Sequence, residues 1–135
     1  MHKVTSGTIV KVSLKNRNEK IKNPMDITVL VDIIGNKLVS GRLYGIKDLE
    51  KHIQKVVVEK FDGKKVFNDQ DDEKEPIDDK VVYIQRADPT LEMLAYEIYR
   101  NLSDYINGMQ YSVTVQLAHS LRSGYCDGIE IKPLT

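Results

Sequence analysis

The chain has no tryptophan, a single cysteine and no excess of either charge. Cys126 is the only cysteine among 135 residues, so an intrachain disulfide and a disulfide-stabilised secreted scaffold are excluded. Basic and acidic residues balance, with 20 Lys and Arg against 20 Asp and Glu. Proteins that bind nucleic acid through its phosphates need a basic excess, so we expect no nucleic-acid partner. A net charge near zero also leaves little repulsion between copies, which favours self-association.

Long apolar runs are missing as well. The longest candidate, residues 27–34, is interrupted by Thr28 and Asp32 and is much shorter than the roughly 18 residues of a membrane span. The N-terminal sequence MHKVTSGTIV lacks the apolar segment of a signal peptide. We therefore expect no membrane partner and a cytoplasmic location, which the lone cysteine also favours.

The composition is that of a globular protein, with 41% apolar and 30% charged residues, and the length suits one domain over residues 1–135. β-Branched segments predict strands over 7–14 and 26–34. Apolar residues repeating every three to four positions predict amphipathic helices over 46–60 and 89–106. Segments 111–120 and 125–133 predict a C-terminal hairpin.

The order strand, strand, helix, helix, strand, strand predicts an α+β fold. We expect a four-stranded antiparallel sheet with both helices on one face. Such a sheet has two open edges, which invite pairing between copies, and joining several sheets into a barrel removes those edges.

An acidic insertion separates the two helices, at about 62–88. Residues 69–79, DQDDEKEPIDD, include seven acids, and residues 80–85 are a candidate short strand. A metal loop or a docking surface for a basic partner is one interpretation, but the calcium-loop pattern of glycine and terminal glutamate is absent. Clustered like charges repel and stay hydrated, so we expect a solvated loop.

Several short motifs occur in a characteristic order. Residues 41–49 read GRLYGIKDL before the first helix, residues 89–95 read PTLEMLA at the second, and residues 113–117 read VTVQL in a strand. Over about residues 21–132 this arrangement resembles the 6-pyruvoyltetrahydropterin synthase family, which includes 6-carboxytetrahydropterin synthase. The resemblance implies the tunnelling fold, in which subunits join their sheets into barrels, typically trimers stacked as hexamers.

The resemblance also implies a zinc site, whose residues are missing here. In the family, zinc is held by one histidine on the first strand and a His-Gly-His pair at the start of the second. The pair is replaced by Asn23-Pro24-Met25, and the first-strand position falls near Lys15. Catalytic zinc needs about three protein ligands. We therefore expect no metal and no other cofactor, and we expect the family lyase reaction to be lost.

The catalytic residues of the family are also largely missing from this sequence. Its nucleophilic cysteine matches the stretch 18–22, which contains none, and Cys126 lies far along the chain, where we expect a small buried side chain. Asp62 matches the aspartate of an Asp-His pair, but Gly63 follows it. Asp62 is thus the candidate catalytic residue, although Asp-Gly is equally a turn sequence.

Three residues are predicted to bind a small planar heterocycle, such as a pterin or a purine. Thr90 and Glu92 match the ring-binding neighbourhood of the family, although a helix cap explains them equally well. The glutamate that anchors the pterin falls on Leu117, which cannot accept hydrogen bonds. Gln116 is adjacent, but it reaches the same face only if a bulge turns it inward.

The sequence therefore indicates a degenerate relative of the pterin synthases, forming a trimer or hexamer with a heterocycle pocket between subunits. Two alternatives stay open. An active enzyme with rebuilt, metal-free acid/base chemistry would use Asp62, Glu92 or Lys15. A structural or regulatory subunit would instead use the acidic loop as a docking surface.

Overall fold

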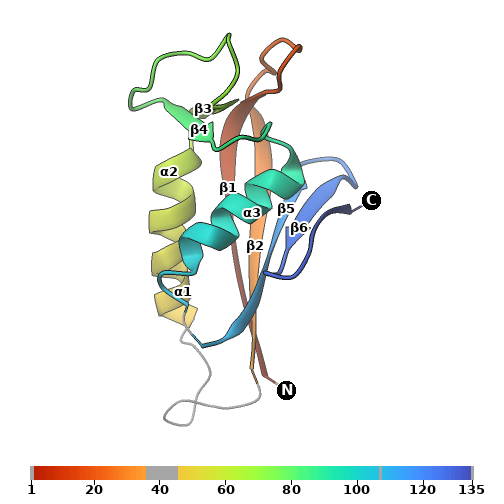
Figure 1. Ribbon diagram of the computed structural model, residues 1–135. Helices are drawn as coiled ribbons and strands as arrows, with labels where there is room; N and C mark the ends of the chain where they lie inside the picture. Colours follow the sequence, from red (N-terminus) through yellow and green to blue (C-terminus); the bar gives the residue numbers. More distant parts are fainter. Residues whose placement is uncertain (1, 36–45, 107, 135) are drawn as a thin grey trace.

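A curved sheet with helices on one face is the frame of the molecule (Figure 1). The computed structural model describes residues 2–35, 46–106 and 108–134. The strands follow the spatial order β4-β3-β1-β2-β5-β6-β7. The elements are β1 (His2–Lys15), β2 (Met25–Gly35), α1 (Ile46–Ile53), the π-helical segment η1 (Gln54–Val58), α2 (Glu59–Phe61), β3 (Lys64–Asn68), β4 (Val81–Ile84), α3 (Leu91–Leu102), β5 (Gln110–Leu117), β6 (Ser123–Cys126) and β7 (Ile131–Leu134).

The long hairpin β1–β2 forms the centre of the sheet. Its antiparallel register runs from His2 opposite Gly35 to Val12 opposite Met25. Every second side chain faces the helices, which is the periodicity of a half-buried strand. The apolar residues on this face are buried: Val10, Val12, Leu14, Ile27, Val29, Val31 and Ile33. The two predicted N-terminal strands are confirmed, and β1 extends further toward the N-terminus than its apolar pattern indicated.

The predicted four-stranded antiparallel sheet is wrong, because the described residues form a sheet of seven strands. β3 pairs in parallel with the end of β1, and β4 pairs in parallel with β3. Both lie in the segment predicted as an insertion, where only residues 80–85 were a candidate strand. β3 reads KKVFN, which is too short and too charged to show strand periodicity. The parallel pairing arises because the helical segment 46–61 carries the chain back along β1 before β3 begins.

The C-terminal hairpin also differs from the prediction. Residues 125–133 contain parts of two strands, β6 and β7, rather than one. The turn between them uses Gly128 with a φ of 88°. The Asp127 carboxylate closes this turn by accepting hydrogen bonds of 2.8 Å from the backbone N–H groups of Ile129 and Glu130.

Both helices lie on one face of the sheet, as expected (Figure 1). α1, η1 and α2 follow one another without a break over the predicted helix 46–60. Thr90 caps α3, because its Oγ1 accepts a hydrogen bond of 3.3 Å from the Met93 N–H. α3 buries the stripe Leu94, Ala95, Ile98 and Leu102, and it ends four residues before the predicted position.

A buried carboxylate joins the two helical segments. Glu97 on α3 accepts hydrogen bonds from Lys60 at 3.0 Å and from Arg100 at 2.9 Å. Burial alone would raise the pKa of Glu97, but the Arg100 and Lys60 contacts outweigh it and hold the pKa below its ordinary value. Glu97 therefore remains charged and connects α3 to the end of α2.

The acidic loop is anchored to the sheet by a buried ion pair at Asp71 and by contacts of Glu75 with Lys65 and Tyr83, which corrects the prediction of a fully solvated loop. Asp71 is only 3% exposed and Lys15 only 4%. The Lys15 Nζ lies 2.9 Å from Asp71 Oδ2, and Asp71 Oδ1 accepts a hydrogen bond of 2.9 Å from the Glu73 N–H. Asp72, Asp78 and Asp79 are exposed as expected. Charge clustering indicated hydration, but the neutralising lysine comes from a strand far earlier in the chain.

Two other expectations concern Cys126 and membrane-spanning helices. Cys126 is 1% exposed, and this burial raises the pKa of its thiol, so it behaves as the small buried side chain that was predicted. Among the described residues, no helix combines the length and the apolar character needed to cross a membrane.

We predict that Asp71→Asn lowers the melting temperature by several degrees at pH 7, because it leaves the buried Lys15 ammonium without its counter-charge. The Glu73 N–H and Lys15 hold the pKa of Asp71 below its ordinary value of 3.8. Ionised Asp71 therefore stabilises the folded state above that pH, and the stabilisation is lost as the pH falls through the lowered pKa. The difference between wild type and variant should accordingly shrink below pH 3.8.

The control is Asp72→Asn, which removes a neighbouring exposed carboxylate. Thermal unfolding followed by circular dichroism at pH 7 and at acidic pH gives the comparison. Equal melting temperatures for the two variants at pH 7 would show that the Lys15–Asp71 pair does not anchor the loop.

Candidate functional site

A cavity of about 510 Å³ opens beside the N-terminal end of α3. Four parts of the chain form its walls: the end of β1, the start of β2, the first turn of α3 and the β5–β7 edge of the sheet. The apolar lining residues are Leu14, Met25, Pro89, Leu91, Leu117, Pro133 and Leu134, and the polar ones are Asn16, Lys22, Thr90, Glu92, Arg122 and Ser123. An apolar cavity with a few polar groups is the usual form of a small-molecule site.

A glycine on β6 determines where α3 begins. A Cβ atom on Gly124 would lie 2.1 Å from the Glu92 backbone nitrogen and 2.2 Å from the Leu91 carbonyl carbon. The helix backbone thus rests directly on the strand, and any side chain at this position would push it away. This contact places Glu92 on the wall of the cavity.

The segment that leads into α3 is fixed by hydrogen bonds to Asp88. Its Oδ1 accepts from the Arg17 N–H at 3.2 Å and from Asn68 Nδ2 at 3.1 Å. Its backbone carbonyl accepts from the Thr90 N–H at 2.8 Å. The β1–β2 connection, β3 and α3 are therefore held together above the cavity.

The structure brings two of the predicted ligand-binding residues together. Thr90 and Glu92 both line the cavity, although the Thr90 hydroxyl is also engaged as the helix cap. Glu92 is partly buried, and within the described chain its carboxylate has no hydrogen-bond or ion-pair partner. Glu92 is thus an unpaired acceptor on the wall of a cavity whose lining is partly apolar and partly polar.

Gln116 is not brought to this cavity. Strand β5 pairs with β6 without a bulge from Val113 to Gln116, so Gln116 and Leu117 face opposite sides of the sheet. Leu117 lines the cavity, whereas Gln116 Nε2 donates to the Ser120 carbonyl at 3.3 Å. The bulge that a ligand-binding role for Gln116 requires is absent from this part of the described sheet.

Asp62 also lies elsewhere. Its Oδ1 accepts a hydrogen bond of 2.9 Å from the Lys11 N–H, and the Gly63 N–H donates to the Lys11 carbonyl at 2.7 Å. Gly63 has a φ of 75°, which suits glycine at the end of a helix. These contacts match the turn interpretation, and Asp62 is not one of the residues that line the cavity.

The residues of the cavity do not fit zinc. Met25, which lies where the resemblance places a histidine, lines it, and Glu92 is the single carboxylate among its described lining residues. The side chains of Lys22 and Arg122 also line the cavity, and their positive charges would repel a cation. Over residues 2–35, 46–106 and 108–134, no group of three or more His, Cys, Asp or Glu residues is arranged to hold a metal ion. Lys15 does not line the cavity at all, because it pairs with Asp71.

Sequence reasoning missed Lys22 and Arg122 as cavity residues. Lys22 lies in the connection between β1 and β2, and Arg122 lies in the turn before β6. No periodic pattern identifies residues in such segments, and only the fold brings the two together.

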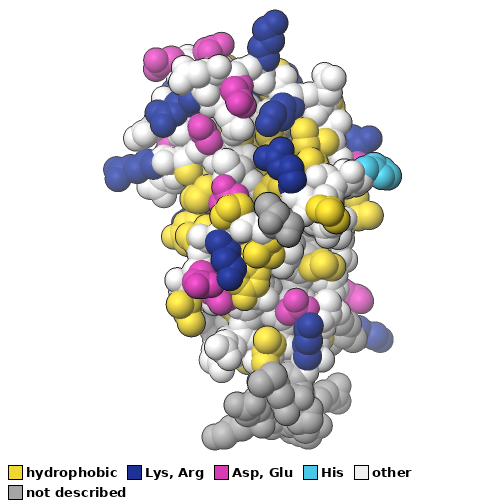
Figure 2. Space-filling model, turned by 90° about the vertical axis from the view of Figure 1, so that its right-hand side faces the viewer, with side chains coloured by type: hydrophobic (Ala, Val, Ile, Leu, Met, Phe, Trp, Pro, Cys, Tyr) yellow, Lys and Arg dark blue, Asp and Glu magenta, His cyan; other side chains and the backbone are white. Residues whose placement is uncertain are grey.

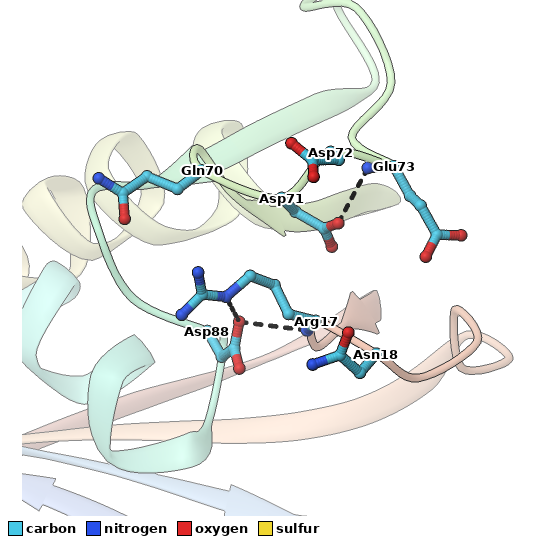
Figure 3. A pocket seen from close by; sticks show the side chains of 7 residues that line it. All are labelled: Arg17, Asn18, Gln70, Asp71, Asp72, Glu73 and Asp88. Carbon is cyan, nitrogen blue, oxygen red and sulfur yellow. Dashed lines mark hydrogen bonds and ion pairs between the residues drawn. The ribbon is translucent and has the colours of Figure 1, made fainter.

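A second cavity, of about 360 Å³, lies under the acidic loop. Figure 3 shows Gln70, Asp71, Asp72 and Glu73 on one side of it and Arg17, Asn18 and Asp88 on the other. Its one buried carboxylate among the described lining residues, Asp71, pairs with Lys15, and the more exposed Arg17 lies 3.7 Å from Asp88. This cavity is therefore part of the loop anchor, and it contains none of the predicted site residues.

Comparison with known proteins gives matches among solved structures. No protein-family model and no curated protein sequence matches the chain. A catalytic-residue mutant of 6-pyruvoyltetrahydropterin synthase from Plasmodium vivax superimposes with a TM-score of 0.74 at 12% identity, covering 93% of this chain and 98% of that one. An uncharacterized protein from Wolinella succinogenes gives 0.73 at 13% identity, covering 94% and 98%.

The corresponding synthase from Plasmodium falciparum gives a TM-score of 0.66 at 9% identity, covering 98% of this chain and 96% of that one. At such identities the similarity concerns the fold, and it extends over nearly the whole length of both chains. The chain thus has the fold of the 6-pyruvoyltetrahydropterin synthases.

Proposed function

We propose that the protein is a 6-pyruvoyltetrahydropterin synthase-like binding protein that has lost the zinc-dependent lyase reaction. In this proposal the cavity beside α3 takes a pterin- or purine-like heterocycle. The observation that carries it is the unpaired Glu92 carboxylate on the wall of a cavity of about 510 Å³. That volume falls within the roughly 300–1,000 Å³ typical of small-molecule sites.

The chemistry of the cavity suits a planar ring with an N–H edge. A carboxylate accepts paired hydrogen bonds from adjacent ring N–H and amino groups, as in a pterin or a guanine. Leu91, Leu117 and Met25 offer apolar surfaces for the ring faces. Leu117 also removes the second acceptor that the family resemblance leads one to expect, so we propose weaker and less specific ring binding than in the synthases.

Loss of the lyase reaction is supported by the positions of the candidate catalytic groups. Cys126 is buried in the core, Asp62 is hydrogen-bonded in a turn, and Lys15 is neutralised by Asp71. Metal-free acid/base chemistry that combines Asp62, Glu92 and Lys15 is disfavoured, since only Glu92 lines the cavity. A purely structural role explains Glu92 as an acid at the positive end of the α3 dipole, but it does not explain the cavity that Glu92 lines.

We expect Leu117→Glu to increase affinity for biopterin by about ten- to a hundredfold. The substitution supplies a second carboxylate from the strand facing Glu92, and a hydrogen bond to a charged group contributes roughly 1.5–3 kcal/mol. Adding Glu92→Gln should remove part of this gain. Fluorescence titration of biopterin into wild type and both variants measures the effect, with Glu50→Gln on the exposed face of α1 as the control. Identical binding in all proteins, or none, would contradict a ring site at Glu92.

We further propose a homo-oligomer, a trimer or hexamer, in the cytoplasm and without nucleic-acid or membrane partners. β3 covers only residues Val12–Lys15 of β1, so the described part of β1 before Val12 pairs on one side alone. At the opposite edge, Figure 2 shows hydrophobic side chains gathered on the face that β6 and β7 border. Ile129 is 83% exposed there and Ile131 44%. Open strands and exposed apolar residues at both edges favour sheet-to-sheet pairing between copies.

Light scattering should therefore show three or six subunits at micromolar concentration. Ile131→Lys should shift the population toward smaller species, because it places a charge at the exposed β7 edge. Lys132→Arg serves as the control on the same strand. A wild-type protein that stays monomeric would contradict the proposed assembly.

A further inference from the structure

The cavity beside α3 holds two basic side chains in a place where the resemblance leads one to expect a metal. Lys22 and Arg122 line it together with Glu92, and among the described residues these three are the only charged ones in its lining. We propose that Lys22 and Arg122 form an oxyanion site, which binds a carboxylate or phosphate group of the ligand without a metal. The inference rests on the proposed function, in which Glu92 holds the heterocyclic ring.

Hydrogen bonds hold the backbone of Arg122 in place, whereas its guanidinium has no partner in the described chain. The Arg122 N–H donates to Ser120 Oγ at 3.1 Å, and its carbonyl accepts from the Leu117 N–H at 3.1 Å. In the part of the chain that the structure describes, no hydrogen bond or ion pair engages the guanidinium. Arg122 is exposed at the rim of the cavity, so its guanidinium is available to a ligand without breaking an existing contact.

The backbone of Lys22 is also held by a hydrogen bond, and its ammonium is available to a ligand. Its N–H donates to the Leu14 carbonyl at 3.0 Å, which ties the residue to the end of β1. Its ammonium lies 4.0 Å from Glu19, and both side chains are about half exposed. Such a surface pair contributes little, so the ammonium can turn to a ligand at small cost.

Glu92 does not neutralise the two cations. Lys22 and Arg122 share a cavity with this carboxylate, yet no ion pair joins Glu92 to either of them. The lining therefore has two positive charges against one negative, and the positive end of the α3 dipole lies on the same wall. A ligand with a hydrogen-bond donor edge for Glu92 and an acidic substituent for the two cations satisfies all three groups.

The pairing of an arginine with a lysine points to an oxyanion in particular. A guanidinium donates two parallel hydrogen bonds to a carboxylate or phosphate, and an ammonium adds a point charge. The same two charges disfavour a metal ion in this space. The acidic substituent would thus be recognised directly by side chains of this chain.

Two pterins that differ in a single substituent test the inference, namely 6-carboxypterin and the neutral 6-methylpterin. We expect wild type to bind 6-carboxypterin about tenfold more tightly, which corresponds to one charge-assisted contact. Arg122→Gln and Lys22→Gln should each reduce this preference, and together they should abolish it without weakening 6-methylpterin. Lys20→Gln, an exposed neighbour in the same connection that does not line the cavity, should leave the preference intact.

Failure of the oxyanion site and failure of the ring site give different results. Equal affinity for both pterins in wild type would overturn the inference and leave the ring proposal standing. If neither pterin binds, the effect of orthophosphate on thermal stability tests the oxyanion site separately. Thermal stabilisation by phosphate in wild type but not in Arg122→Gln would uphold the oxyanion site alone, and no such difference would overturn it.

Discussion

The direct contact between the first turn of α3 and Gly124 is the constraint on which the site depends. Leu91 and Glu92 rest with their backbone on β6, at a separation that leaves no space for a Cβ atom. The Thr90 cap and the Asp88 hydrogen bonds then hold the helix start in that place. The cavity exists because the helix meets the sheet at this edge and leaves open the space between β1, β2 and β7.

In the proposed function, fixed cations around that space take the place of the metal that the family resemblance leads one to expect. A metal ion supplies positive charge that attracts anionic ligand groups, and fixed cations supply the same attraction without requiring coordination geometry. Here Lys22 and Arg122 stand in the cavity, while Lys15 is withdrawn into an ion pair with Asp71 under the acidic loop. The two basic environments serve different purposes, since one anchors a loop and the other faces an open cavity.

The sequence allowed the central hairpin, both helical segments and the PTLEMLA helix start to be predicted, because each has a periodic or capping pattern of its own. Thr90 and Glu92, which line the cavity, were singled out because this helix start resembles that of the synthase family. β3, the Lys15–Asp71 pair and the cations Lys22 and Arg122 were not found, because each depends on contacts between residues distant in sequence. Gln116 was misplaced because a bulge in β5 was needed to bring it to the cavity, and β5 pairs regularly there.

The metal content of the purified protein tests the central claim, that this cavity works through its own side chains rather than through zinc. The measurement is elemental analysis of protein purified without chelators, with the Lys22→Gln and Arg122→Gln double variant alongside. The account predicts well under one zinc per subunit in both proteins, because Asn16, Met25 and Glu92 do not make a zinc ligand set. Near-stoichiometric zinc in the wild type, removed only by strong chelation, would contradict it.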